Sequence, residues 1–266
     1  WNSGTVERKQ DMKIKKLWNS FKIAFAMYSK IPMPRADWEK ENMRYMMCFF
    51  PFVGIVIGAL MVGWSFLSGK LGVGDSLQSV IYVLIPVLVT GGIHLDGLLD
   101  TADALSSWQP KEKKLEILKD SNAGAFAVIV ACCYFLACFG FWTELSGRQV
   151  LVLSGGYVLS RSMSGLSVAS FPCARKTGTV ATFSDAVQER TVMTCLYILL
   201  FLSAGFMCLL DAKLGTAAVV GAWCTFFWYY CMSMKQFGGI TGDLAGCFVQ
   251  TCELVMAICV WAAGKF

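Results

Sequence analysis

The chain has 266 residues, of which 56% are hydrophobic and only 15% are charged, and its formal net charge is +5. Soluble domains usually carry about a quarter charged residues, so this composition argues against a soluble globular protein. The small net charge gives no reason to expect a nucleic-acid partner. Twelve cysteines lie without any Cys-x-x-Cys pair beside a single histidine, so no zinc site is expected either.

The first 45 residues form a basic segment that contains ten Lys and Arg residues. Within it, Leu17, Phe21, Phe25 and Tyr28 recur at helical spacing. We predict that residues 1–45 lie in the cytoplasm or along the anionic cytoplasmic leaflet of a lipid bilayer. Residues 46–266 are predicted to form a single transmembrane helical catalytic domain.

Seven apolar stretches follow, each close to the length of about 20 residues that crosses a bilayer. Their ranges are 46–68, 77–93, 123–143, 150–171, 192–210, 214–234 and 244–264. So many long stretches cannot all hide in one soluble core. The sequence therefore predicts an all-α, polytopic membrane bundle with about seven transmembrane helices.

Basic residues are unevenly divided between the loops on the two sides of this bundle. Eighteen Lys and Arg residues fall in the N-terminal segment and alternate loops, against four on the opposite side. The positive-inside rule places the richer side in the cytoplasm, and with seven spans it places the C-terminus outside. We expect a multi-pass membrane protein whose functional loops face the cytoplasm.

The second apolar stretch runs into the sequence GIHLDGLLDTAD at residues 92–103. On a helix, Asp96, Asp100 and Asp103 share one face, where clustered anions beside hydrocarbon require a positive partner. Mg²⁺ bound to a substrate diphosphate would provide it. The alternative is a solvated helix end that happens to be acidic. His94 lies on the opposite side of the same helix. A lone histidine beside a span more often lies at the membrane interface or forms a structural hydrogen bond than takes part in catalysis.

Other polar residues recur at the cytoplasmic ends of the predicted spans and inside two of them. Asp120 either caps the helix that follows it or contacts metal or substrate. Arg161 lies inside a span, where a buried cation needs an acid or a ligand, and Glu253 in the last span is a candidate partner. Arg175 and Lys176 suit phosphate, although basic loops can serve topology alone.

These residues belong to a series of motifs spread along most of the chain. The motifs are IPMPR at residues 31–35, FPFVG at 50–54, GGIHLDGLLDTAD at 91–103, EILKDS at 116–121, Ser160-Arg161, Ala174-Arg175, and GITGD at 239–243 followed by Glu253. The series resembles that of the cobalamin synthase family, the adenosylcobinamide-GDP ribazoletransferases. The chain departs from the family pattern at Asn122 and at Lys176-Thr177-Gly178-Thr179.

The resemblance implies a Mg²⁺-dependent enzyme of the cell inner membrane that joins adenosylcobinamide-GDP to α-ribazole, or to its 5′-phosphate, and releases GMP. Whether the chain forms a homo-oligomer is left open. The expected metal ligands are Asp96, Asp100 and Asp103; the expected catalytic residues are Asp103, Asp243 and Arg161; and the expected substrate contacts are His94, Asp120, Arg175, Lys176, Thr241 and Glu253.

Two alternatives use similar residues. A CDP-alcohol phosphotransferase also binds a nucleotide diphosphate through aspartates on membrane helices, but its pattern expects Ala-Arg after Asp-Gly-x-x, where this chain has Leu98-Leu99-Asp100. An ion-coupled transporter could use intramembrane Asp, Glu and Arg residues. It would place its polar groups near the midplane rather than at one face.

Overall fold

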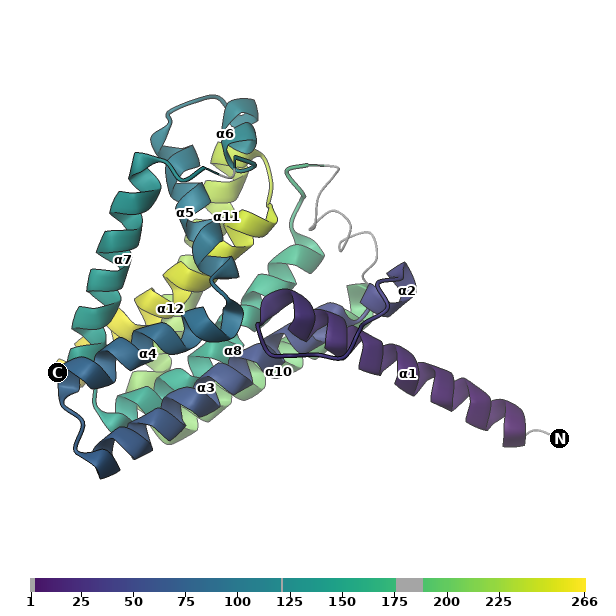
Figure 1. The fold of residues 1–266 in the computed structure, drawn as a ribbon, viewed down its shortest axis with the longest axis horizontal. Coiled ribbons are helices and arrows are strands. Elements are labelled where there is room, and N and C mark those ends of the chain that lie inside the picture. Colours follow the sequence, from purple (N-terminus) through teal and green to yellow (C-terminus); the bar gives the residue numbers. More distant parts are fainter. Residues whose placement is uncertain (1–2, 121, 176–188) are drawn as a thin grey trace.

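A computed structural model of the chain describes residues 3–120, 122–175 and 189–266. Across these ranges the regular structure is α-helical, apart from an isolated bridge between Cys173 and Ile240 (Figure 1). The helices are α1 (Ser3–Tyr28), α2 (Lys40–Met43), α3 (Met46–Leu71), α4 (Asp75–Thr90), α5 (Ile93–Ser106), α6 (Lys111–Ile117), α7 (Ala125–Glu144), α8 (Gly147–Ser170), α10 (Glu189–Leu210), α11 (Ala212–Phe237) and α12 (Gly242–Lys265).

In the described part of the chain, five helices are long and apolar enough to span a membrane: Met46–Leu71, Ala125–Glu144, Arg190–Leu210, Ala212–Phe237 and Gly242–Lys265. The pair α4 and α5 raises the number to six if it counts as one bent span. The predicted all-α membrane bundle is therefore confirmed, with a number of spans close to the predicted seven.

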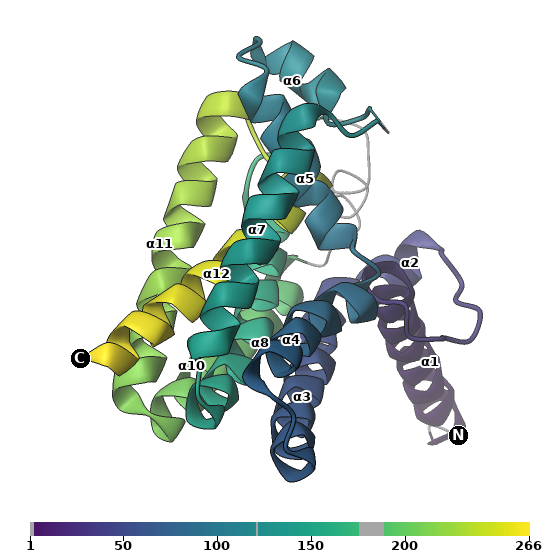
Figure 2. The ribbon, with the colours of Figure 1, turned by 60° about the vertical axis from the view of Figure 1, so that its left-hand side comes forward.

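The remaining predicted span, 150–171, is helix α8, which lies at the centre of the bundle (Figure 2). Its Ser and Gly residues and Arg161 lower its hydropathy, yet its 24 residues extend for about 36 Å, enough to cross a bilayer. It packs against α3, α10, α11 and α12, and it is buried along most of its length. Neighbouring helices thus shield its polar side chains from lipid.

Small residues allow α3 to approach α8 closely. A Cβ at Gly54 would collide with the carbonyl group of Tyr157, and a Cβ at Gly58 would lie 2.6 Å from the carbonyl oxygen of Ser154. Such contacts between small residues are a common basis of helix association in membranes, where no hydrophobic effect drives apolar helices together.

The chain turns sharply between α4 and α5, by 95°. Gly91 and Gly92 form this bend with φ angles of +66° and +80°, a left-handed conformation that glycine adopts without steric cost. The bend directs α5 away from α4 and across the start of α12.

Helix α1 joins the bundle only through its last turns. Ile23, Ala24 and Phe25 are buried, whereas Leu17 and Trp18 nearer the N-terminus are exposed. Figure 1 shows the first half of α1 extending away from the body. The predicted interfacial position of residues 1–45 remains a prediction, but the last turns of α1 are part of the core of the protein.

Replacing Gly54 by Ala tests the α3–α8 contact. The added methyl group would overlap the Tyr157 carbonyl, so we expect a loss of about 1–3 kcal/mol of stability and a lower melting temperature in detergent. Gly63 is the matched control on the same helix, since no atom would lie within 4 Å of its Cβ. Equal melting of the Gly54→Ala and Gly63→Ala variants would contradict this packing.

Candidate active site

The candidate site lies where α5 crosses the N-terminal end of α12. A Cβ at Gly97 would lie 2.5 Å from the Asp243 carbonyl oxygen, and a Cβ at Gly246 would lie 3.2 Å from the Cα atom of His94. The Gly97 position therefore needs glycine, and at Gly246 a Cβ would force the backbone near His94 to shift by a few tenths of an ångström. The crossing brings the carboxylates of α5 beside the carboxylate of Asp243.

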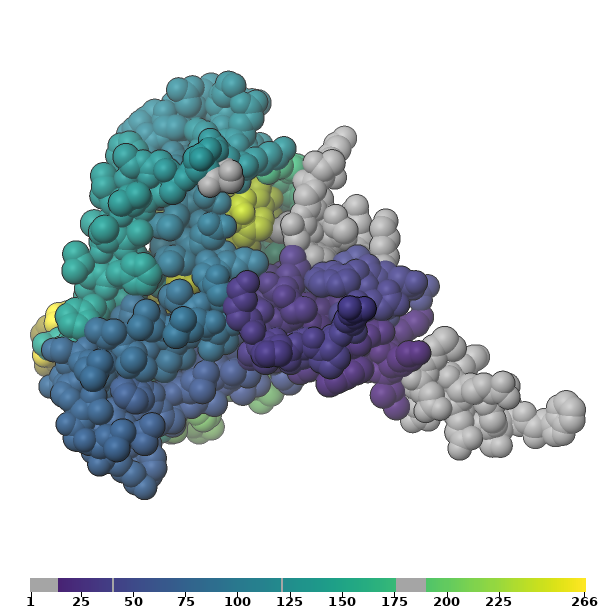
Figure 3. All heavy atoms as spheres, viewed as in Figure 1, coloured from purple at the N-terminus to yellow at the C-terminus, as the bar shows by residue number. Residues whose placement is uncertain are grey.

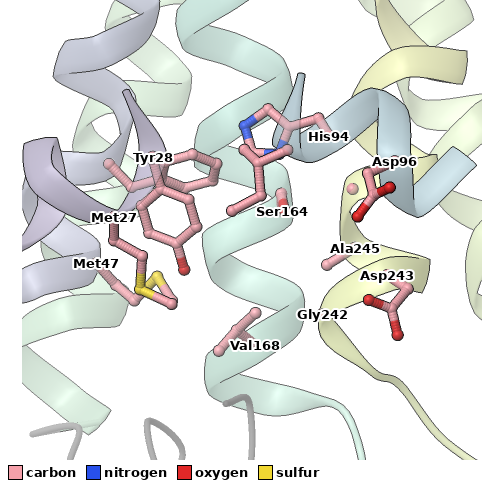
Figure 4. Close-up of a pocket in the computed structure, with 13 residues that line it drawn as sticks. Met27, Tyr28, Met47, His94, Asp96, Ser164, Val168, Gly242, Asp243 and Ala245 are labelled. Atoms are coloured by element: carbon pink, nitrogen blue, oxygen red, sulfur yellow. The ribbon is translucent and has the colours of Figure 1, made fainter. Parts of the chain in front are cut away.

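A cavity of about 140 Å³ lies beside this crossing, between α1, α3, α5, α8 and α12. Figure 4 shows its two walls, with Asp96 and Asp243 on one side and Met27, Tyr28 and Met47 on the other. In Figure 3, atoms near the start of α12 are visible between α5 and the N-terminal segment. One wall of the cavity is thus anionic and the other is largely apolar.

The predicted acidic stripe is only partly directed at this cavity. Asp96 lines it, and Asp100 lies within electrostatic reach of Asp96, Asp103 and Asp243. In the described ranges, no three carboxylate, histidine or cysteine side chains are gathered closely enough to hold a metal by themselves. The metal roles of Asp96, Asp100 and Asp103 therefore remain predictions.

Asp103 has a structural role that the sequence did not predict. Its two carboxylate oxygens accept hydrogen bonds from the backbone N–H groups of Gly124, at 2.6 Å, and Ala127, at 2.9 Å. Asp103 thereby caps the N-terminus of α7, where unpaired N–H groups and the helix dipole favour a negative charge.

Of the two interpretations of Asp120, the helix cap is therefore wrong, and the contact with metal or substrate remains a prediction. Asp120 is exposed and accepts hydrogen bonds from the backbone and side-chain nitrogens of Asn122, at 3.0 and 2.8 Å. These bonds lower the pKa of the Asp120 carboxyl below its ordinary value. The helix begins too far along the chain from Asp120, so Asp103 from α5 occupies the capping position.

Two loops meet beside the site, one after the C-terminal end of α8 and one before the N-terminal end of α12. The backbone N–H of Ile240 donates to the Pro172 carbonyl, and that of Ala174 donates to the Ile240 carbonyl, both at 2.9 Å. Gly239, with φ near +158°, allows this pairing because a Cβ there would lie within 2.5 Å of the Ala174 nitrogen. Thr241 then caps α12, its hydroxyl accepting from the Leu244 N–H at 3.3 Å.

The paired loops place Arg175 within electrostatic reach of Asp243. Its guanidinium donates a hydrogen bond to the Leu115 carbonyl of α6. Partial burial lowers the pKa of Arg175, and the charge of Asp243 opposes this shift. Arg175 therefore adds a positive charge beside the anionic wall. Lys176, its predicted partner in phosphate binding, lies outside the described residues.

Arg161 does not line the cavity. Its Nη1 atom donates to Glu253 Oε1 at 2.6 Å, and the Ser160 hydroxyl donates to the same oxygen at 3.0 Å. The predicted pairing of Arg161 with Glu253 is confirmed. This pair lies between α8 and α12, where each charge neutralises the other within the core. The predicted catalytic role of Arg161 and the predicted substrate contact of Glu253 remain predictions.

His94 is buried and lines the cavity together with Asp96. Its ring lies 6.0 Å from that of Tyr28 and 5.6 Å from that of Phe50, between centroids. Among the described residues, its Nε2 atom has no hydrogen-bond partner. A ligand or water in the cavity would provide one.

Comparison with known proteins adds to this geometry. The family model described as cobalamin-5-phosphate synthase matches residues 20–261. The chain belongs to this family. A relative named adenosylcobinamide-GDP ribazoletransferase from Lachnoclostridium phytofermentans is 42% identical over 91% of this chain and 93% of its own.

A relative of the same name from Clostridium perfringens is 30% identical over 88% of this chain and 93% of its own. Another, from Geobacillus kaustophilus, is 29% identical over 93% of this chain and 97% of its own. No solved structure matches. The predicted membership of the cobalamin synthase family is confirmed, and neither the CDP-alcohol phosphotransferase nor the transporter reading is favoured.

In this member of the family, sequence reasoning missed the apolar wall of the cavity. Tyr28 had been noted only as part of an amphipathic stripe, and Phe50 only as part of a motif. Met27, Met47 and Ser164 carried no signal, because the packing of α1, α3 and α8 against the site cannot be predicted from local spacing.

Substitution of Asp103 tests its capping role. Asp103→Ala removes both hydrogen bonds to α7, and we expect a loss of about 1–2 kcal/mol, seen as a lower melting temperature in detergent. Asp103→Asn keeps a single acceptor oxygen and should fall between. Asp120→Ala, on an exposed turn, is the matched control and should melt like the unmodified protein. A control-like Asp103→Ala variant would refute the cap.

The buried ion pair gives a second expectation. Glu253→Gln leaves the guanidinium of Arg161 buried without its counter-charge, which we expect to cost about 3–5 kcal/mol of stability. Adding Arg161→Met should restore part of this loss. Glu144, whose ion pair with Lys265 is exposed, is the control, since Glu144→Gln should change the melting temperature little. Similar losses for Glu253→Gln and Glu144→Gln would count against the buried pair.

Proposed function

We propose that this chain joins adenosylcobinamide-GDP to α-ribazole, or to its 5′-phosphate, and releases GMP. The observation that carries the proposal is the cavity at the α5–α12 crossing, lined by Asp96 and Asp243 with Arg175 nearby. The relatives named adenosylcobinamide-GDP ribazoletransferase support it. The donor contains a diphosphate, the group that clustered carboxylates bind through a divalent cation.

The donor atoms near the cavity fit Mg²⁺. They are carboxylate oxygens, and they are too few at one point to enclose an ion, which suits a cation that keeps waters and takes phosphate oxygens as further ligands. We propose Asp96 and Asp100 as the residues that would hold it. When bound, the ion would neutralise charge on the diphosphate. Asp103 is a weaker candidate because both its oxygens already accept hydrogen bonds from α7.

The proposed reaction is a displacement at phosphorus. An acceptor ribose hydroxyl forms a bond to the phosphorus attached to cobinamide, and the bond from that phosphorus to the oxygen of GMP breaks. The hydroxyl proton passes to a carboxylate, for which Asp243 is better placed than Asp103, because it lines the cavity. Arg175 stabilises negative charge on the departing phosphate, so that catalysis consists mainly of positioning and charge neutralisation.

We further propose that the site faces the cytoplasm from the inner membrane. The basic helix α6 packs against α5 and α11 at the end of the bundle where the site lies, in agreement with the positive-inside rule. Soluble GMP could then leave directly into the cytoplasm.

The test is GMP release by the protein in liposomes supplied with adenosylcobinamide-GDP and α-ribazole. We expect release with Mg²⁺ and none with excess chelator. Asp96→Asn removes a charge from the anionic wall and should lower turnover about 100-fold. Asp75→Asn is the matched control, since Asp75 is exposed at the first turn of α4, away from the site, and should leave turnover unchanged.

A lack of GMP release by the unmodified protein would overturn the proposal. Release of CMP from a CDP-alcohol donor would instead support the phosphotransferase alternative. Full turnover in Asp96→Asn would show that this aspartate has no role in the reaction.

A further inference from the structure

The wall opposite the carboxylates has a chemistry of its own. Met27 and Tyr28 from α1 and Met47 and Phe50 from α3 line it, and none of them carries a charge. Figure 4 shows the sulfur atoms of both methionines facing the cavity, with the Tyr28 ring beside them. The rings of Tyr28 and Phe50 lie 4.3 Å apart, between centroids. Thioethers and aromatic rings together form a surface that suits a flat, apolar group.

Few hydrogen-bonding groups interrupt this surface. They are the Tyr28 hydroxyl, the Ser164 side chain, and the buried Nε2 atom of His94, which has no partner among the described residues. Guanine presents several donors and acceptors along its edges, most of which would stay unpaired here at a cost in binding energy. The wall therefore disfavours the base of the departing nucleotide.

The acceptor named above has the complementary chemistry. α-Ribazole carries a dimethylbenzimidazole, two fused rings with two methyl groups whose only free hydrogen-bonding atom, once joined to ribose, is one ring nitrogen. Apolar cavities on the order of 150 Å³ take up a single aromatic ring, and this cavity of about 140 Å³ is of that size and is partly open.

We propose that the wall formed by Met27, Tyr28, Met47 and Phe50 is the binding subsite for the aromatic base of the acceptor. The inference rests on the proposed function, and it gives the acceptor, the second substrate of that reaction, a binding position in the cavity. With the base against this wall, the attached ribose extends toward Asp96 and Asp243, where its hydroxyl meets the phosphorus. The two walls of the cavity thus hold the two reactants.

The first measurement compares two acceptors on the unmodified protein, α-ribazole and its analogue without the two methyl groups, at saturating donor. Burial of each methyl group contributes about 0.8 kcal/mol, so kcat/KM for the analogue should be about tenfold lower. The KM for adenosylcobinamide-GDP should not differ between the acceptors. Equal kcat/KM values would overturn the subsite, because the methyl groups would then lie outside an apolar pocket.

The second measurement repeats the comparison in Met27→Ala. Removing this side chain should lower kcat/KM for α-ribazole about fivefold to tenfold, leave the donor KM unchanged, and reduce the discrimination between the acceptors. Met193→Ala on α10 is the matched control, a partly buried methionine outside the cavity, and should keep the discrimination. Melting temperatures of both variants separate binding from folding.

The outcomes distinguish the subsite from the proposed function. A rise in donor KM in Met27→Ala with an unchanged acceptor kcat/KM would assign the wall to the donor and overturn the subsite. An unchanged profile would also overturn it, while GMP release by the unmodified protein would leave the proposed function standing. If no GMP is released with either acceptor, both the subsite and the proposed function are overturned.

Discussion

The close approach of α5 and α12 at Gly97 and Gly246 is the contact on which the site depends. Without side chains at these two positions, the backbone of α5 lies against the start of α12, and the carboxylates of both helices share one wall of a cavity. A Cβ at Gly97 would overlap the Asp243 carbonyl oxygen and force the two helices apart. The glycine bend at Gly91 and Gly92 serves the same end, because it turns α5 into this crossing.

The structure separates two uses of charge that look alike in the sequence. Arg161 and Glu253 neutralise each other inside the bundle, where an unpaired ion is costly. Among the described residues, the carboxylates at the α5–α12 crossing have only the nearby Arg175 as a positive charge, so a bound cation would stabilise them. A charge that is satisfied within the protein supports the fold, whereas one that is not satisfied can bind a ligand.

Much of this arrangement could be predicted from the sequence because it follows from local patterns. Apolar length gave the spans, and the spacing of Asp96 and Asp100 placed them on one helix. The pairing of Arg161 with Glu253 followed from the cost of burying either alone. The cap that Asp103 provides to α7 joins residues more than 20 positions apart. The apolar wall of the cavity depends on how α1 packs. Neither feature could be predicted from local spacing.

The position of Arg161 on the central helix has a consequence for the order in which the chain is assembled. Glu253 belongs to the last helix, so during synthesis α8 enters the membrane long before its counter-charge exists. Until α12 arrives, the guanidinium must rely on the Tyr157 carbonyl, to which it donates at 3.0 Å, and on water. Helix α12 therefore completes the core as well as the site, because it carries both Glu253 and Asp243.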